Sequence, residues 1–200
     1  DDFNLSANFV KAHFDENLYD ITDVEAQQDA KLISKRGIKA NGEKIKFSIK
    51  NKNILVSGKN SFLLINNINM SSNQSIEVDN LKGNFILIGE GSYIKTENIE
   101  VYGTNIDGSY LQNKEGFEVE SLNVTDTNKV NILTDSIEMF AKKATYSKKI
   151  NTIELFDEVK IIRGKEIIIG DYATIDTLNE SYKIKNINSK SVKVLITEDN

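Results

Sequence analysis

Apolar and polar residues alternate through most of this 200-residue chain. In segments such as Ile45–Ile49, Ile76–Val78 and Val192–Val194, every second residue is apolar, and the residues between them are chiefly polar. A spacing of two places the apolar side chains on one face of a strand. Asn, Gly and Asp interrupt the alternation about every 8 to 12 residues, which is typical of hairpin turns. The pattern therefore predicts many short antiparallel strands.

A second regularity extends over longer distances. An apolar anchor is followed by apolar residues seven and nine positions later and by a small or turn-forming residue at position eleven. The six anchors are separated by 35, 31, 32, 36 and 29 residues; they are Ala12, Phe47, Val78, Tyr110, Tyr146 and Ile175. Such a period is typical of a stacked supersecondary unit, here a pair of strands with a turn between them.

The chain shows no change of composition that would divide it, so residues 1–200 are interpreted as one domain of about fourteen to sixteen strands. A closed barrel, a two-sheet sandwich and an open folded-over sheet all fit this pattern. A unit that recurs along the whole length favours the third, an elongated, twisted antiparallel sheet of the all-β class. Asp23–Lys35 has a helix-friendly composition without a 3.6-residue period, and it is interpreted as two strands with a turn near Asp29.

Composition removes several classes of function. The chain has no Cys and no Trp, one His and a net charge of −5. Thiolate catalysis and cysteine zinc sites are therefore excluded, and a basic stripe for nucleic acid is not expected. His13 lies in an acidic segment and is interpreted as a surface residue, so no Ser-His-Asp arrangement is predicted. We expect no enzyme activity, no catalytic residue, no metal site and no cofactor.

Charge is distributed unevenly. Residues 1–30 hold eight acidic side chains and one basic side chain, whereas residues 142–196 hold eleven basic and seven acidic ones. Two interpretations stay open. The difference can be ordinary variation on a soluble surface, or it can favour contact between the acidic end of one copy and the basic end of another.

No apolar run approaches the roughly 20 residues that a membrane-spanning helix needs. The sequence opens on Asp1-Asp2 without a basic region or an apolar stretch. We expect from this start a mature exported protein from which a targeting segment has been removed.

Three segments resemble the repeat of the OstA-like lipopolysaccharide-transport family, which includes LptA and LptC; they are Phe140–Tyr146, Ile153–Gly164 and Ile169–Asp176. Val192–Ile196 resembles the strand that closes such domains. The sequence departs from the family pattern at Phe156-Asp157, where the family usually has a glycine.

The resemblance implies a periplasmic, non-enzymatic protein with a V-shaped antiparallel sheet. Members of the family stack end to end and carry the acyl chains of lipopolysaccharide between their two sheet faces, from the inner to the outer membrane. The partners implied are the lipid A acyl chains, other Lpt components at both membranes and further copies of the same chain.

A physical argument from the residues agrees with this role. An apolar strip between two layers can hold lipid tails at about 0.8 kcal/mol for each buried methylene. The candidate groove residues occupy the alternate apolar positions of the repeat: Phe47, Ile54, Val56, Phe62, Leu64, Val78, Phe85, Leu87, Phe117, Val119, Tyr146, Ile153, Leu155, Ile161, Ile169, Ile175 and Ile184. Each of them could instead be an ordinary core residue. The open sheet edges expected to continue into a neighbouring molecule are Leu5–Val10 and Val192–Ile196, with Leu5, Val10, Val192 and Val194 as contact residues.

Three alternatives accompany this hypothesis. The chain could be the periplasmic part of a membrane-anchored, LptC-like component. It could be a structural or adhesive repeat protein without a lipid ligand. A carbohydrate-active enzyme is a third possibility, and the absence of Trp and of clustered Tyr weighs against it.

Overall fold

The computed structural model describes residues 3–16, 20–35, 37–113, 116–179, 181–186 and 191–196. All sixteen strands belong to one antiparallel sheet. The strands are β1 (Phe3–Ser6), β2 (Phe9–Phe14), β3 (Ile21–Ser34), β4 (Ile38–Ser48), β5 (Asn53–Ser57), β6 (Ser61–Ile65), β7 (Ile68–Ser72), β8 (Ser75–Asp79), β9 (Asn84–Lys95), β10 (Glu100–Asn113), β11 (Gly116–Leu133), β12 (Glu138–Ser147), β13 (Thr152–Arg163), β14 (Glu166–Asp176), β15 (Ser181–Lys185) and β16 (Lys193–Ile196). One short 3₁₀ turn, Lys148–Ile150, connects β12 to β13.

The sheet is folded over into two layers because its long strands change partners halfway along. The first half of β3, for example, pairs with β2 and its second half with β1. The long strands β3, β4 and β9 to β14 contribute to both layers. Layer 1 is completed by β2, β5, β8 and β15, and layer 2 by β1, β6, β7 and β16, so each layer has twelve strand segments.

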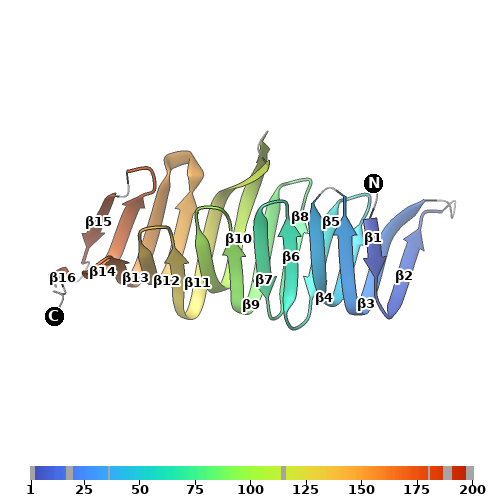
Figure 1. Ribbon diagram of the computed structural model, residues 1–200, viewed down its shortest axis with the longest axis horizontal. Helices are drawn as coiled ribbons and strands as arrows, with labels where there is room; N and C mark the ends of the chain where they lie inside the picture. Colours follow the sequence, from blue (N-terminus) through green and yellow to red (C-terminus); the bar gives the residue numbers. More distant parts are fainter. Residues whose placement is uncertain are drawn as a thin grey trace.

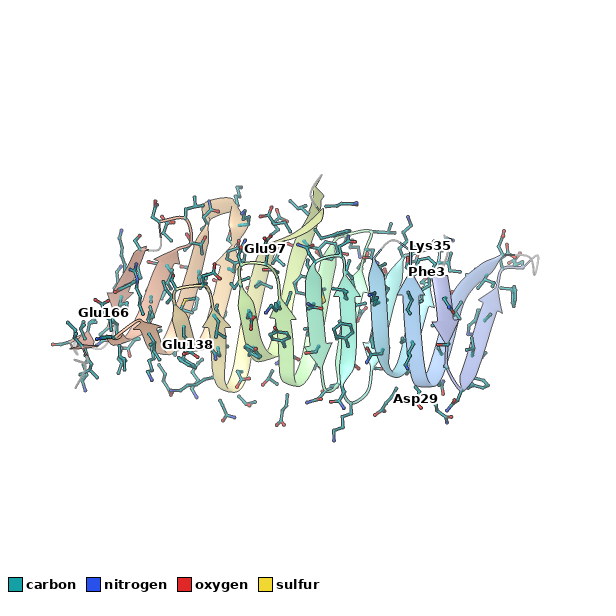
Figure 2. All side chains as sticks on the ribbon, in the orientation of Figure 1. Phe3, Asp29, Lys35, Glu97, Glu138 and Glu166 are labelled. Atoms are coloured by element: carbon teal, nitrogen blue, oxygen red, sulfur yellow. The ribbon has the colours of Figure 1, made fainter. Side chains whose placement is uncertain are left out.

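The strands stack side by side along the long axis, and the two chain ends lie at opposite ends of it (Figure 1). The two long sides of the molecule differ in how the chain connects its strands. Along one side the chain bends from one layer into the other, as at Gln28-Asp29 and Asp157-Glu158. Along the opposite side hairpin turns connect neighbouring strands within a layer. Figure 2 shows Asp29 on the bend side and Lys35 and Glu97 on the turn side.

The sequence repeat corresponds to the hairpins of layer 1. The anchor pairs across the turn with the residue seven positions later in Phe47↔Ile54, Val78↔Phe85, Tyr146↔Ile153 and Ile175↔Tyr182. The first and fourth copies differ. Ala12 pairs with Val24, while Tyr19 lies outside the described residues, and Tyr110 pairs with Val119 rather than with Phe117.

The interior is closed next to the bends. One inner row of layer 1 crosses all twelve segments, and its members from Ala26 to Ala173 are buried: Val10, Ala26, Ile45, Val56, Ile76, Leu87, Ile106, Val124, Ala144, Leu155, Ala173 and Ile184. The facing row of layer 2 includes Leu32, Leu63, Ile94, Ile132 and Ile161, which are also buried. These two rows form the continuous core.

The prediction for Asp23–Lys35 was wrong. Residues Ile21–Ser34 form one long strand, and its two halves pair with other strands rather than with each other. The predicted turn is a bulge, where Gln28 and Asp29 both have positive φ angles. A bulge bends a strand without reversing it, and alternation alone does not distinguish it from a turn.

Two local features explain departures from the repeat. Asp157 has a φ of 61°, so an aspartate takes the left-handed conformation where the repeat that this segment resembles usually has a glycine. Gly108 lies two residues before the anchor Tyr110, where the other five copies have an apolar residue. A Cβ at Gly108 would lie 2.8 Å from Cζ of Phe85 and 2.2 Å from the carbonyl oxygen of Ser121, so the position requires glycine.

Candidate functional site

Two cavities open between the layers on the turn side of the molecule. The larger, of about 740 Å³, lies in the half nearer the N-terminus and is lined by residues from both layers, among them Phe3, Ile38, Phe47, Ile65 and Tyr110. The smaller, of about 510 Å³, lies in the other half. Phe117 lines both cavities, so they form two sections of one groove along the turn side.

Four aromatic rings contribute to the wall of the larger cavity. The ring centroids of Phe3 and Phe47 are 4.6 Å apart, and those of Tyr110 and Phe117 are 5.1 Å apart in an edge-on arrangement. Aromatic rings present large apolar surfaces with few rotatable bonds. This section can therefore hold hydrocarbon with little rearrangement.

The polar group of Tyr110 is satisfied within the protein. Its hydroxyl donates a hydrogen bond to Oδ1 of Asn80 at 2.6 Å, and Nδ2 of Asn80 donates to the carbonyl oxygen of Lys52 at 2.8 Å. Burial, followed by the nearby charge of Asp79, raises the pKa of Tyr110 to about 12. The ring therefore stays neutral at physiological pH, and the groove wall remains uncharged at this point.

The smaller cavity has an apolar floor and a polar rim. Its floor includes Val119, Ile153 and Ile175, which are buried. On the rim, Nζ of Lys148 lies 2.7 Å from Oε1 of Glu118. The cavity is suited to an apolar chain inside with polar groups held near the opening.

The predicted groove residues fall into three groups, and Ile184 is described apart from them. Six line the two cavities: Phe47, Phe117, Val119, Tyr146, Ile153 and Ile175. Seven are buried in the interior without lining either cavity: Ile54, Val56, Val78, Phe85, Leu87, Leu155 and Ile161. Ile184 is partly buried and packs against the core near the C-terminal end.

Phe62, Leu64 and Ile169 form the third group, and their prediction as inward residues was wrong. Ser61, Leu63 and Ile65 are the buried residues of β6, so Phe62 and Leu64 point to the outer face of layer 2. Ile169 follows the buried Ile168 and is exposed. Both segments carry consecutive apolar residues, and a strand that is apolar on both faces gives no phase from which the inner face could be assigned.

Sequence reasoning did not select several residues that line the cavities. Phe3, Ile38 and Ile65 lie at the ends of strands in layer 2, and Ile137 and Met139 lie at the turn between β11 and β12 or just after it. The repeat detects the hairpins of layer 1 alone. Alternation in the layer 2 segments, such as Ile65 and Ile68 on either side of a two-residue turn, was the signal that could have found them.

The two ends of the sheet are unpaired within the described part of the chain. β1 and β2 pair with β3 alone, and β15 and β16 pair with β14 alone. The predicted contact residues lie at these ends: Leu5 in β1, Val10 in β2, Val194 in β16 and Val192 just before it. Each end therefore presents two edge strands, one from each layer.

In the described ranges, no group of three or more His, Cys, Asp or Glu residues is arranged to hold a metal ion. His13 is exposed on β2. No helix within the part of the chain described here is long and apolar enough to cross a membrane.

One solved structure with the same fold is LptH from Pseudomonas aeruginosa, which its title describes as the LptA-homologous periplasmic component of the conserved lipopolysaccharide transport device. The TM-score is 0.54 and the sequence identity is 14%, over 66% of this chain and 95% of that chain. No family model and no curated protein sequence matches the chain. The likeness establishes the LptA-like folded-over sheet as the fold.

Proposed function

We propose that this protein is a non-enzymatic periplasmic carrier that holds the acyl chains of lipopolysaccharide in the groove between its layers. The observation that supports this most directly is the pair of cavities, of about 740 and 510 Å³, that open along the turn side, contain apolar residues in their walls and share Phe117. Because both cavities open between the two layers, a long, flexible chain can enter them from the side.

The energetics of the groove suit this role. Each buried methylene contributes about 0.8 kcal/mol, so a tail of about a dozen carbons is held by several kcal/mol without a polar pocket. Binding of this strength is reversible, as transfer from one carrier to the next requires. Both cavities have polar residues at the opening, including Lys52 and Lys82 in the larger one and Lys148 in the smaller one.

End-to-end assembly is the second part of the proposal, in which copies of this chain and other Lpt components form a bridge between the inner and outer membranes. Neighbouring strands are antiparallel, and each layer has an even number of segments. A second copy in the same orientation can therefore add β2 beside β15 and β1 beside β16 with antiparallel pairing in both layers. The groove then continues across the junction.

Two alternatives keep the same fold. A membrane-anchored, LptC-like component would use the same groove and one of the two ends. In a structural repeat protein without a lipid ligand the two cavities would have no function. The opening of both cavities between the layers does not favour this alternative.

Ligand binding tests the proposal. The purified protein is mixed with an apolar fluorescent dye, and lipopolysaccharide is added as a competitor. We expect saturable dye binding that lipopolysaccharide reverses, and weaker binding in Phe117→Ser because Phe117 lines both cavities. Phe62→Ser is the matched control, since Phe62 points to the outer face. Absence of dye binding, or equal loss in both variants, would contradict a groove between the layers.

A further inference from the structure

The hairpin turns of layer 1 form one lip of the groove, and after the first turn each has one exposed aliphatic side chain in it or in the strand beside it. These five residues, called the apolar lip below, are between 43% and 70% exposed; they are Ile49, Leu81, Leu111, Ile150 and Leu178. Phe14 and Ile21, also exposed, flank the first turn of the same layer. Successive turns are two strands apart, so the tips follow one another at about 9.5 Å and span about 40 Å.

Two of these turns are built in the same way and hold their leucine outward. Oδ1 of Asp79 accepts hydrogen bonds from the backbone N–H groups of Leu81 and Lys82, at 3.1 Å each. Oδ1 of Asp176 accepts the equivalent bonds from Leu178 at 2.9 Å and Asn179 at 3.1 Å. Such Asx turns fix the backbone, so each leucine is presented to solvent by an ordered turn.

The other lip has the opposite character. The turns of layer 2 present residues such as Asn66-Asn67, Glu97 and Asp135. The described residues of these turns include no large exposed hydrophobic side chain, and of those in the strands beside them Ile33 and Tyr102 are exposed. Ile99 and Ile137 are turned inward, where they line the smaller cavity. The exposed aliphatic row is therefore specific to one lip.

Charge differs between the layer 1 turns and the bends. The layer 2 turns are mixed, with Lys35 and Lys165 beside Glu97 and Asp135. The described residues of the layer 1 turns that follow the first one include five lysines and no acidic residue; the lysines are Lys50, Lys52, Lys82, Lys148 and Lys149. The first turn, between β2 and β3, is acidic instead and carries Asp15, Glu16 and Asp20. No ion pair within the described ranges involves Lys50, Lys52 or Lys149. The bends on the opposite side of the molecule are mainly acidic: Asp29, Glu43, Glu90, Asp126, Asp157, Glu158 and Asp171, with Lys59, Lys129 and Lys142 as the basic residues. The molecule has a net charge of −5, and the layer 1 edge is nevertheless basic from Ile49 to Leu178.

We propose that the apolar lip is a docking edge for the surface of an anionic phospholipid bilayer. Aliphatic side chains inserted at the boundary between headgroups and acyl chains, with lysines beside them, are the combination by which proteins bind such surfaces. Tips about 9.5 Å apart do not form the continuous apolar patch of a protein interface, but each can insert separately between lipid headgroups.

The position of the lip next to the groove also favours a lipid surface as the occupant. Ile49, Leu81 and Leu111 line the larger cavity and Leu178 lines the smaller one. A docked molecule would therefore face the bilayer with the opening of its groove. The docking itself does not depend on the proposed carrier function, whereas lateral entry of an acyl chain into the groove does.

The test uses a variant that alters the lip without altering either cavity. Lys50, Lys149 and Ile150 line neither cavity, so the lip variant is Lys50→Gln, Lys149→Gln and Ile150→Thr. Its matched control is Lys59→Gln, Lys129→Gln and Ile86→Thr, which removes two lysines from the bends and one exposed isoleucine from the outer face of layer 1. Flotation with vesicles of phosphatidylglycerol and phosphatidylcholine, and of phosphatidylcholine alone, measures binding.

We expect the native protein and the control to bind the anionic vesicles, more weakly at high salt, and to bind neutral vesicles poorly. The lip variant should lose about 25-fold in affinity from its two lysines alone, at about fivefold for each lysine near an anionic surface. Adding Leu81→Thr and Leu178→Thr should weaken binding further. Equal loss in the lip variant and the control, or no binding of the native protein to anionic vesicles, would overturn the proposal.

Dye binding by the native protein, the triple lip variant and its control, whose substitutions line neither cavity, separates this inference from the carrier function. If vesicle binding fails while the dye still binds, the docking edge is wrong and the groove stands. If vesicle binding behaves as expected while no dye binds, the docking edge stands and the carrier function is wrong.

Discussion

Substitutions in the closed core and in the groove should have opposite effects on stability and ligand binding. Leu87 lies in the inner row next to the bends and is 0% exposed. Leu→Ala at such a site costs about 2.7 to 5.0 kcal/mol because it removes buried methyl groups and leaves a cavity. For a chain of this size each kcal/mol lowers Tm by about 2 to 4 °C. Leu87→Ala should therefore lower Tm by roughly 5 to 20 °C and leave the affinity of the folded protein for an acyl chain nearly unchanged.

Phe117→Ala should do the reverse. Phe117 is partly buried and lines both cavities, so its ring is already adjacent to open space. The loss of about half the burial of a phenylalanine costs about 1 kcal/mol of folding free energy. If the ring covers about two methylenes of a bound chain, its removal weakens binding by about 1.6 kcal/mol, or roughly 15-fold.

Thermal unfolding followed by circular dichroism and titration with an apolar dye, both at the same pH and salt, measure the two effects. The comparison rests on the two layers being closed at the bends and open at the turns. Equal destabilisation by both variants would mean that Phe117 is a core residue. Loss of dye binding in folded Leu87→Ala, with Phe117→Ala unaffected, would place the ligand next to the bends rather than at the turns and refute the reasoning.

Three further outcomes are expected. Val10→Asp and Val194→Asp, at the two exposed sheet ends, should each shift self-association measured by sedimentation velocity toward monomer, whereas Ile86→Asp on the outer face should not. If opposite charges at the two ends contribute to assembly, association should weaken as salt is raised from about 0.05 to 0.5 M, and a salt-independent result would exclude that contribution. The hydroxyl of Tyr172 donates a hydrogen bond to Glu154, and the pKa of Tyr172 is raised to about 12. Because this folded-state pKa lies above the ordinary value of 10, the hydrogen bond stabilises the fold below pH 10, and that stabilisation is lost toward pH 12. In Glu154→Gln the phenolate absorbance should therefore appear at lower pH than in the native protein.

The hairpins of layer 1 could be predicted from the sequence because the two strands of each hairpin lie close together in the chain. Phe47 and Ile54 are paired across the turn in the way that a spacing of seven requires. The partner change within each long strand could not be predicted. It depends on bulges such as Gln28-Asp29 and Asp157-Glu158, whose left-handed residues are not glycines in this chain. Composition gives no signal that distinguishes such a bulge from a turn.

The groove could be predicted in kind but not residue by residue. All apolar residues of the inner rows satisfy the same alternation, whether they lie at the bends, as Leu155 does, or at the turns, as Phe117 does. Only the separation of the two layers distinguishes them, and that separation is a property of the folded-over sheet as a whole. In a run of consecutive apolar residues such as Phe62–Ile65, the sequence also does not indicate which face of the strand points inward.

The fold ties the capacity of the groove to the number of strands. Each strand segment pairs only with its immediate neighbours along the sheet, as in other repeat proteins, so a hairpin can be gained without changing the cross-section. The alignment with LptH covers 95% of that chain and 66% of this one, so about a third of this chain lies outside it. Each additional layer 1 hairpin lengthens the groove by about 9.5 Å and adds one more turn to the lip. In the proposed carrier, the length of hydrocarbon held and the length of the proposed docking edge therefore increase together, and the two ends proposed for assembly stay the same.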